Sequence, residues 1–334
     1  MLTLPVFEWV RPTTVDDVLR ELAAHPGECL VVAGGTDAVP NLKHRLHEPK
    51  RVLALRGVKD LKYVREDAAG LHLGPLVTLT ELAQLPQLAP SSGGYPAGLA
   101  RAASLVASPQ IRNMGTLGGN LCLDTRCTYY NQTYFWREAL GFCLKKSGTV
   151  CHVVPQGKRC VAAHSSDVAP MLIALGAEVE IAGAKGRRTI GVESFFIGDG
   201  IHNNVLEQGE LVTRISVPAT ARGMRTAYQK LRPRGAIDFP MLSIAVAARG
   251  SAASIESLTI VVSALGAKPR TIGQLDALAK GRAANEETFA AIAQAAHKQC
   301  RPLTNVPYDD DWRHAMVPVF VTRALREAFA PVPA

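Results

Sequence analysis

Two glycine-rich turns constrain the fold of this chain of 334 residues more than any other feature. Residues 7–55 follow the order strand, helix, strand, helix, strand. The second strand, Cys29–Val32, leads through Gly34 and Gly35 into a predicted helix, Ala38–Leu46. Paired glycines at such a junction leave backbone N–H groups free to meet an anion such as a pyrophosphate. A plain tight turn is the commoner explanation of a glycine pair, so this turn alone decides nothing.

The second turn, Ala107–Asn120, is longer and more polar. It places three glycines and several side-chain hydrogen-bond donors within fourteen residues. Such a segment is too polar for a core, and its composition is not that of a linker, so a bound ligand is the simplest reason for it. An Ω-loop held by its own hydrogen bonds is the alternative.

The rest of the chain predicts an α+β architecture in three domains. Short strands alternate with helices as far as Val217, and the joint is expected near Pro218–Gly223. Beyond the joint, three strand candidates precede two alanine-rich helices: Arg225–Leu231, Leu242–Ala248 and Ser257–Ser263, then Glu286–Cys300 and Trp312–Phe329. The expected domains are residues 1–57, 58–217 and 218–334, with an insert at about 124–163 in the second.

Composition and charge limit the function classes. The net charge is +8, but lysine and arginine are scattered, which favours acidic protein partners or cofactor phosphates over nucleic acid. The sequence has no run of 18 uncharged apolar residues and no signal-peptide pattern, so we expect neither a membrane span nor export. In a cytoplasmic protein, the seven cysteines are better explained as thiols or metal ligands than as disulfides.

Four of these cysteines fall within the insert. Cys127, Cys143, Cys151 and Cys160 follow the spacing C-x15-C-x7-C-x8-C. Four thiolates can hold an iron–sulfur cluster or a zinc ion, and this spacing matches neither a ferredoxin run nor a zinc ribbon. By spacing alone the choice stays open among iron, zinc and unligated thiols.

Several motifs together resemble the FAD-binding subunits of the xanthine dehydrogenase and carbon monoxide dehydrogenase family. These motifs are Gly34–Asp37 after a strand, Gln110–Asn120, Ser166–Pro170 and Tyr228–Arg232. The resemblance covers essentially the whole chain. It implies a PCMH-type FAD-binding fold, in which two N-terminal α/β subdomains clasp the flavin, followed by a C-terminal α+β domain of the CO dehydrogenase flavoprotein type.

The resemblance also implies which residues contact FAD. They come from both turns, from the Ser-Asp motif and from the Tyr-Gln-Lys motif: Val32, Ala33, Gly34, Gly35, Thr36, Asp37, Gln110, Ile111, Asn113, Thr116, Gly119, Asn120, Asp167 and Lys230. None of them is expected to be catalytic, because in this family the substrate binds to a molybdopterin-containing partner subunit.

The insert lies between two FAD-contacting motifs, which favours a redox centre over a structural metal. Its segments Thr125–Tyr130, Phe142–Lys146, Cys151–Val153 and Gln156–Cys160 resemble the FAD subunits of 4-hydroxybenzoyl-CoA reductases. That resemblance implies a 4Fe-4S cluster on the four cysteines, with His152 not a ligand. It also implies electron flow from ferredoxin through the cluster and FAD to a 2Fe-2S subunit and then molybdenum, in a dimer of heterotrimers that reduces 4-hydroxybenzoyl-CoA to benzoyl-CoA.

Two other functions stay possible at this point. One is the FAD subunit of an aldehyde or xanthine-type molybdenum oxidoreductase, in which electrons run in the oxidative direction. The other is a non-enzymatic binding module stapled by zinc, which predicts a colourless protein without flavin.

Overall fold

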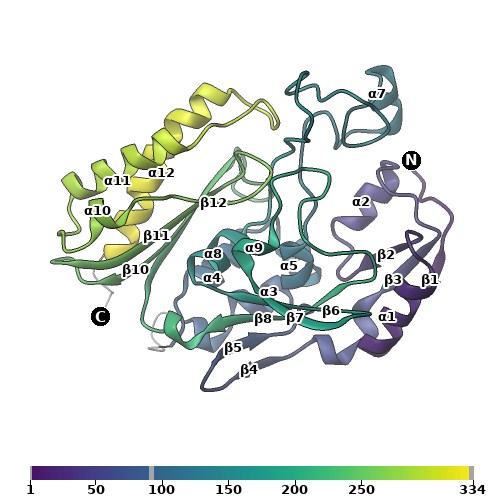
Figure 1. Ribbon diagram of the computed structural model, residues 1–334, viewed down its shortest axis with the longest axis horizontal. Helices are drawn as coiled ribbons and strands as arrows, with labels where there is room; N and C mark the ends of the chain where they lie inside the picture. The colour runs from purple at the N-terminus through teal and green to yellow at the C-terminus, as the bar shows by residue number, and fades with distance from the viewer. Residues whose placement is uncertain (1, 90–93, 331–334) are drawn as a thin grey trace.

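The computed structural model describes residues 2–89 and 94–330, whose strands form three sheets (Figure 1). The first sheet is parallel, with strand order β1-β3-β2, and consists of β1 (Glu8–Val10), β2 (Cys29–Val32) and β3 (Arg51–Ala54). Parallel neighbours require crossover connections. Two helices provide them, α1 (Val15–Ala24) and α2 (Ala38–Lys43).

The first sheet confirms the predicted alternation, with one difference in length. The predicted helix Ala38–Leu46 ends earlier, at Lys43. Arg45 adopts a left-handed backbone conformation with φ of 57°, which a continuing helix excludes. Leu46 is nevertheless buried, because the chain turns back toward the body of the protein.

The second sheet has five antiparallel strands in the order β4-β5-β8-β6-β7. They are β4 (Val64–Glu66), β5 (Gly70–Leu73), β6 (Glu178–Gly183), β7 (Gly186–Gly191) and β8 (Leu211–Pro218). The pattern of apolar residues predicted β5, β6 and β8. It missed β4 and β7, because these edge strands are almost wholly exposed and carry no buried alternation.

The third sheet is antiparallel and follows the order β12-β11-β10-β9. Its strands are β9 (Arg225–Leu231), β10 (Leu242–Gly250), β11 (Ile255–Ser263) and β12 (Arg270–Thr271). Side chains alternate between the two faces of β10. Ile244 and Val246 therefore pack under the C-terminal helices, whereas Ala245 and Ala247 join the core of the second sheet.

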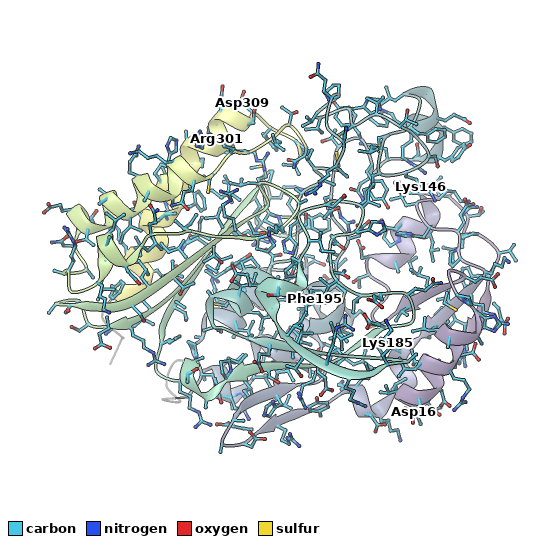
Figure 2. All side chains as sticks on the ribbon, viewed as in Figure 1. Asp16, Lys146, Lys185, Phe195, Arg301 and Asp309 are labelled. Atoms are coloured by element: carbon cyan, nitrogen blue, oxygen red, sulfur yellow. The ribbon has the colours of Figure 1, made fainter. Side chains whose placement is uncertain are left out.

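A layer of helices lies between the second and third sheets (Figure 1). The helices of this region are α3 (Leu79–Ala83), α4 (Gly98–Ser104), α5 (Pro109–Met114), α6 (Leu117–Leu121), α8 (Val168–Ala174) and α9 (Val192–Phe195). Every residue of α8 is buried. Phe195, also fully buried, lies near the middle of the molecule, where the largest core cluster forms (Figure 2).

Three helices follow strand β12: α10 (Asp276–Ala279), α11 (Glu286–Gln299) and α12 (Asp310–Phe329). The two longer ones, α11 and α12, cover the outer face of the third sheet. Short 3-10 turns occur at Leu55–Gly57, Lys59–Leu61, Pro86–Leu88 and Ala219–Ala221. Within the described residues, none of the helices combines the length and the apolar character that crossing a bilayer requires.

The insert projects from the body of the molecule beside α2 and carries one helix, α7 (Tyr134–Ala139) (Figure 1). Its two ends meet at an antiparallel bridge: the Arg126 amide donates to the Ala163 carbonyl at 2.8 Å, and the Ala163 amide donates back at 2.7 Å. The mixed architecture agrees with the predicted fold class. For the domains we propose the division already predicted, at residues 57 and 217.

Candidate functional site

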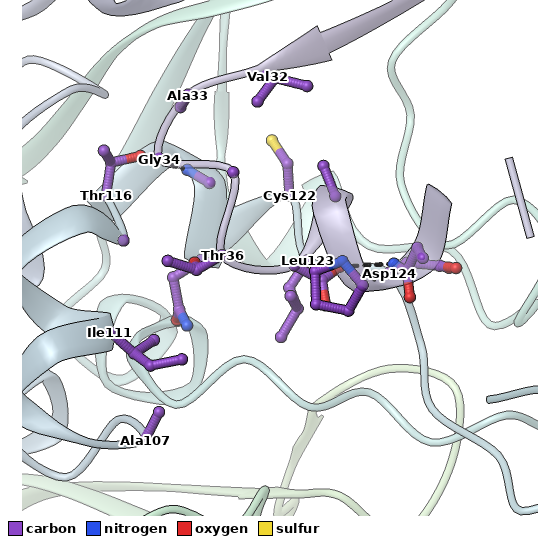
Figure 3. A pocket seen from close by; sticks show the side chains of 18 of the residues that line it. Val32, Ala33, Gly34, Thr36, Ala107, Ile111, Thr116, Cys122, Leu123 and Asp124 are labelled. Atoms are coloured by element: carbon purple, nitrogen blue, oxygen red, sulfur yellow. Dashed lines mark hydrogen bonds between the residues drawn. The ribbon is translucent and has the colours of Figure 1, made fainter. Parts of the chain in front are cut away.

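A cavity of about 670 Å³ lies between the two glycine-rich turns (Figure 3). This volume falls within the ~300–1,000 Å³ typical of small-molecule and cofactor pockets. Most of the predicted FAD contacts line it: Val32, Ala33, Gly34, Gly35, Thr36, Asp37, Ile111, Thr116, Gly119 and Asn120. Ile237 and Phe239, from the loop between β9 and β10, lie on its wall as well. Two turns some eighty residues apart in the sequence thus form the centre of the cavity, and the loop before β10 adds to its wall.

The first turn is locked against the second by a close approach of backbones. A Cβ atom on Gly34 would lie 1.9 Å from the carbonyl oxygen of Met114, so only glycine fits there. Gly35 has φ of +72°, a conformation that also favours glycine. Glycine is therefore required at Gly34 by close packing and favoured at Gly35 by the backbone conformation.

The second turn is not a loop but two short helices, α5 and α6, each begun by a side-chain cap. The hydroxyl of Ser108 accepts from the Ile111 amide at 3.4 Å, and that of Thr116 accepts from the Gly119 amide at 3.1 Å. The residue pattern concealed these helices because both are short, α5 begins at Pro109, and α6 contains Gly118 and Gly119, which disfavour helix. Capping leaves Gly119 exposed to the cavity, with Thr116 as its nearest neighbour.

Two predicted contacts from this turn lie outside the cavity lining. Gln110 is exposed, and the side-chain oxygen of Asn113 accepts from the Thr80 hydroxyl at 2.7 Å. Asn120 lines the cavity, but its side-chain oxygen accepts from the Ser166 hydroxyl at 2.8 Å and from the Val168 amide at 3.2 Å. Asn120 thereby fixes the start of α8.

Asp167 and Lys230 also lie outside the cavity lining, where they form a buried ion pair. The Lys230 ammonium donates to Oδ2 of Asp167 at 2.8 Å and to the Leu105 carbonyl at 3.0 Å, and the Tyr228 hydroxyl donates to Oδ1 of Asp167 at 2.8 Å. Both charged side chains are nearly inaccessible to solvent. Burial raises the pKa of Asp167 and lowers that of Lys230, and their mutual attraction offsets these shifts only in part. The pair joins α8 to the third sheet.

The insert brings its four cysteines around one small cavity of their own. Cys127, Cys143, Cys151 and Cys160 all line it. All four are free thiols, and three of them are buried. Burial raises the pKa of Cys127 to about 11 and also raises that of Cys160. The chain thus gathers the predicted ligand set in one place.

Within residues 2–89 and 94–330, no group of three or more His, Cys, Asp or Glu side chains is arranged to hold a metal ion. The ring of His152 contacts the Phe142 carbonyl through Nε2 and packs on Tyr129, and it also lines the small cavity.

One wall separates the two cavities, and the start of the insert builds it. Asp124 and Arg126 line the larger cavity, whereas Lys145 lines the smaller one. The Lys145 ammonium reaches Oδ1 of Asp124 at 2.7 Å and lies over the Tyr130 ring, 4.2 Å from its centroid. Leu46, from the larger cavity, packs with Tyr130 and Cys143. The two sites are therefore neighbours in one structure.

Comparison with known proteins agrees with this arrangement. Residues 5–220 match the family described as "FAD binding domain in molybdopterin dehydrogenase", and residues 226–328 match the "CO dehydrogenase flavoprotein C-terminal domain". The chain belongs to this family. It is an FAD-binding medium subunit of the molybdenum hydroxylase type, and the predicted PCMH-type fold with its C-terminal domain is confirmed.

Known medium subunits resemble this one along most of their length. The carbon monoxide dehydrogenase medium chain of Hydrogenophaga pseudoflava is 28% identical and is covered to 98%, as is this chain. The aldehyde oxidoreductase FAD-binding subunit of Escherichia coli is 29% identical, over 87% of this chain and 91% of that subunit. A solved structure of the Hydrogenophaga pseudoflava carbon monoxide dehydrogenase superposes with a TM-score of 0.79 at 26% identity, covering 98% of this chain and 99% of that chain.

The larger cavity of this medium subunit fits FAD in its chemistry. Gly119 leaves its floor open, and apolar side chains such as Val32 and Ile111 line its sides. Ala107 and Ile111 lie across from Ala33 and Gly34, on the two turns (Figure 3). A buried guanidinium nitrogen of Arg126 in the wall has no hydrogen-bond partner among the described residues. An oxygen-rich ligand would provide one.

Sequence reasoning missed part of this medium subunit's cavity. Asp124, Arg126 and Asn131 belong to the insert, yet they line the larger cavity together with Phe239. Burial lowers the pKa of Arg126 to about 10 and raises that of Cys122, another lining residue, to about 12. No local pattern marks these residues. The one available signal was the position of the insert, directly after the second turn.

Proposed function

We propose that this subunit carries FAD and a 4Fe-4S cluster within a heterotrimeric molybdenum enzyme of the 4-hydroxybenzoyl-CoA reductase type. The observation that carries the proposal is the convergence of four cysteines on one cavity, next to the larger cavity, which is called the flavin cavity from here on. These cysteines are Cys127, Cys143, Cys151 and Cys160. The curated relatives are medium chains, which supports large molybdopterin and small 2Fe-2S partners for this chain. Its free thiols support a cytoplasmic location.

The reaction proposed for the complex is the reductive removal of the phenolic hydroxyl of 4-hydroxybenzoyl-CoA. Two electrons and two protons are consumed, and benzoyl-CoA and water are formed, with ferredoxin as the proposed donor. The substrate would bind to the molybdopterin partner, so this chain contributes no catalytic residue. A dimer of heterotrimers is the proposed assembly.

The residues of this chain serve to bind and to position. Bound FAD would supply a centre that exchanges electrons singly or in pairs. Gly34 holds the two turns together, Gly119 leaves room at the cavity floor, and the cap at Thr116 orients the start of α6. In the insert, the four thiols, three of them buried, would hold the cluster, whose role would be one-electron exchange.

The test is to purify the full chain anaerobically and to measure iron, labile sulfide, zinc and FAD. We expect iron and sulfide in cluster stoichiometry together with FAD. Cys143→Ala should lose the iron and its visible absorbance, because one of four thiolates is gone. Cys300→Ala is the matched control, since Cys300 is an equally buried thiol in the core of the C-terminal helices.

Two outcomes would contradict the proposal. Iron retained in Cys143→Ala would show that the insert is not the ligand set. Stoichiometric zinc without iron in the wild-type chain would favour the structural-metal alternative instead.

A second candidate is the FAD subunit of a molybdenum aldehyde oxidoreductase. The 29% identity to the Escherichia coli subunit favours it. The two candidates predict opposite electron flow in the assembled complex. Bleaching of the flavin by an aldehyde would support this second candidate, whereas benzoyl-CoA formed with reduced ferredoxin would support the first.

A further inference from the structure

Arg126 lies at the junction of the flavin cavity and the smaller cavity lined by the four cysteines. It is the last residue before Cys127, and its backbone forms both hydrogen bonds of the bridge to Ala163. Its side chain turns the other way and lines the flavin cavity, where it is 8% exposed. The insert thus places a guanidinium group in the lining of the cofactor site.

The contacts of the guanidinium account for only part of its hydrogen-bonding capacity. Nη2 pairs with the carboxylate of Asp37, in the first turn, and the plane lies over the Phe239 ring, 4.6 Å from its centroid. Nη1 is buried and has no hydrogen-bond partner in the part of the chain that the structure describes. Leaving a charged donor buried and unpaired is costly, so a structure that holds it there implies an acceptor.

The ion pair with Asp37 determines how Arg126 can interact with a ligand in the cavity. Because the carboxylate already neutralises the guanidinium, the pair presents no net charge to the cavity. What remains is a directional N–H donor on a rigid, planar group whose position is fixed from both sides. Such a donor suits an oxygen atom of a ligand, and FAD carries these on its phosphates, its ribityl chain and its ring.

We propose that Arg126 is an FAD ligand supplied by the insert, donating from Nη1 to an oxygen of the bound cofactor. The proposal rests on FAD occupying this cavity. It makes the insert part of the flavin site: Asn131, which also lines the flavin cavity, accepts from the Cys127 amide at 2.9 Å through its side-chain oxygen. One short segment therefore positions a cofactor donor and the first cysteine together.

The test compares FAD affinity in variants of the full chain. FAD is removed, and rebinding is followed by quenching of flavin fluorescence. Arg126→Gln should raise the Kd for FAD about tenfold to a hundredfold, the effect of losing a hydrogen bond from a charged donor. Arg126→Lys keeps the charge that pairs with Asp37 but has no second planar donor, so its Kd should rise nearly as much.

Arg137→Gln is the matched control. Arg137 is another buried arginine of the insert, which donates to the His44 and Arg45 carbonyls and does not line the flavin cavity. Its Kd for FAD should stay within about threefold of wild type, as expected where no cofactor contact is lost. Should Arg126→Gln not fold, Arg126→Lys carries the test, because it retains the ion pair.

The outcomes are distinct. Wild-type affinity in both Arg126 variants would overturn the inference, and so would full rescue by lysine, since the role of Arg126 would then end at Asp37. A wild-type chain that does not rebind FAD would overturn the proposed function, and the inference with it.

Discussion

Replacing Lys230 by methionine separates two roles that the residue could have. The Lys230 ammonium donates to Asp167 at 2.8 Å and to the Leu105 carbonyl at 3.0 Å, and its side chain is 1% exposed. Methionine keeps most of the volume and removes the charge. The Leu105 carbonyl keeps a second donor, Nη1 of Arg232 at 3.0 Å. Asp167 keeps only the hydroxyl of Tyr228 among its side-chain donors.

The expected cost follows from the carboxylate that is left behind. The side chain of Asp167 is 3% exposed and cannot recover its hydration. Removing one partner from a buried ion pair typically costs about 3–5 kcal/mol. Because the peptide carbonyl at Leu105 stays satisfied, the neighbouring wall of the flavin cavity at Val106 and Ala107 should keep its position.

The assay is urea unfolding of the full chain, with FAD affinity measured in the same preparations. Lys230→Met should lose about 3–5 kcal/mol of unfolding free energy, with FAD affinity within about threefold of wild type. The double variant Asp167→Asn/Lys230→Met removes both charges and should recover more than half of the loss. A loss below about 1 kcal/mol together with a large loss of FAD affinity would refute this reasoning and identify Lys230 as a direct cofactor contact.

Three further predictions concern the turns and the core. Gly34→Ala places a Cβ 1.9 Å from the Met114 carbonyl oxygen, so urea unfolding should show a loss of about 1–3 kcal/mol or more; unchanged stability would contradict the packing. A Cβ at Gly119 would lie 3.0 Å from the Thr116 hydroxyl and 4.0 Å from the Ala33 Cβ, at the cavity lining. Purified Gly119→Val should therefore keep its fold by circular dichroism but lose FAD; full flavin occupancy would count against this role. His164 is fully buried, and burial lowers its pKa to about 3. In the unfolded chain, His164 binds a proton near pH 6.5, so the free energy of unfolding should fall as the pH drops below that value, by about 2 kcal/mol near pH 5. His164→Gln should not show this fall. The same pH dependence of stability in the variant and the wild type would contradict the prediction.

Local sequence patterns predicted the strands and helices in which regularly spaced apolar side chains are buried. Cys29–Val32 and Arg225–Leu231 match the observed β2 and β9, because half-buried and buried strands show in the spacing of apolar residues. The exposed strand β7 left no such trace. The first glycine turn was also visible, since a glycine pair between a strand and a helix reflects backbone requirements that only glycine meets.

The rest of the site depends on contacts between distant residues. Asp167 and Lys230 are 63 residues apart, and nothing near either one indicates that they pair. Arg126 reaches Asp37 across 89 residues, which places an insert residue in the flavin cavity. The sequence motifs identified the loops that surround this cavity, but the partners of each polar side chain follow from tertiary packing, which no short window contains.

The closed base of the insert has an evolutionary consequence. Its ends are hydrogen-bonded to each other at Arg126 and Ala163, and Asn305 braces both arms by accepting from the Thr128 amide and donating to the Val161 carbonyl. A segment anchored in this way can be acquired or deleted as a cassette, since the scaffold on either side stays in register whatever its length. Under the function proposed above, such a cassette would add a second redox centre to a flavoprotein in one step.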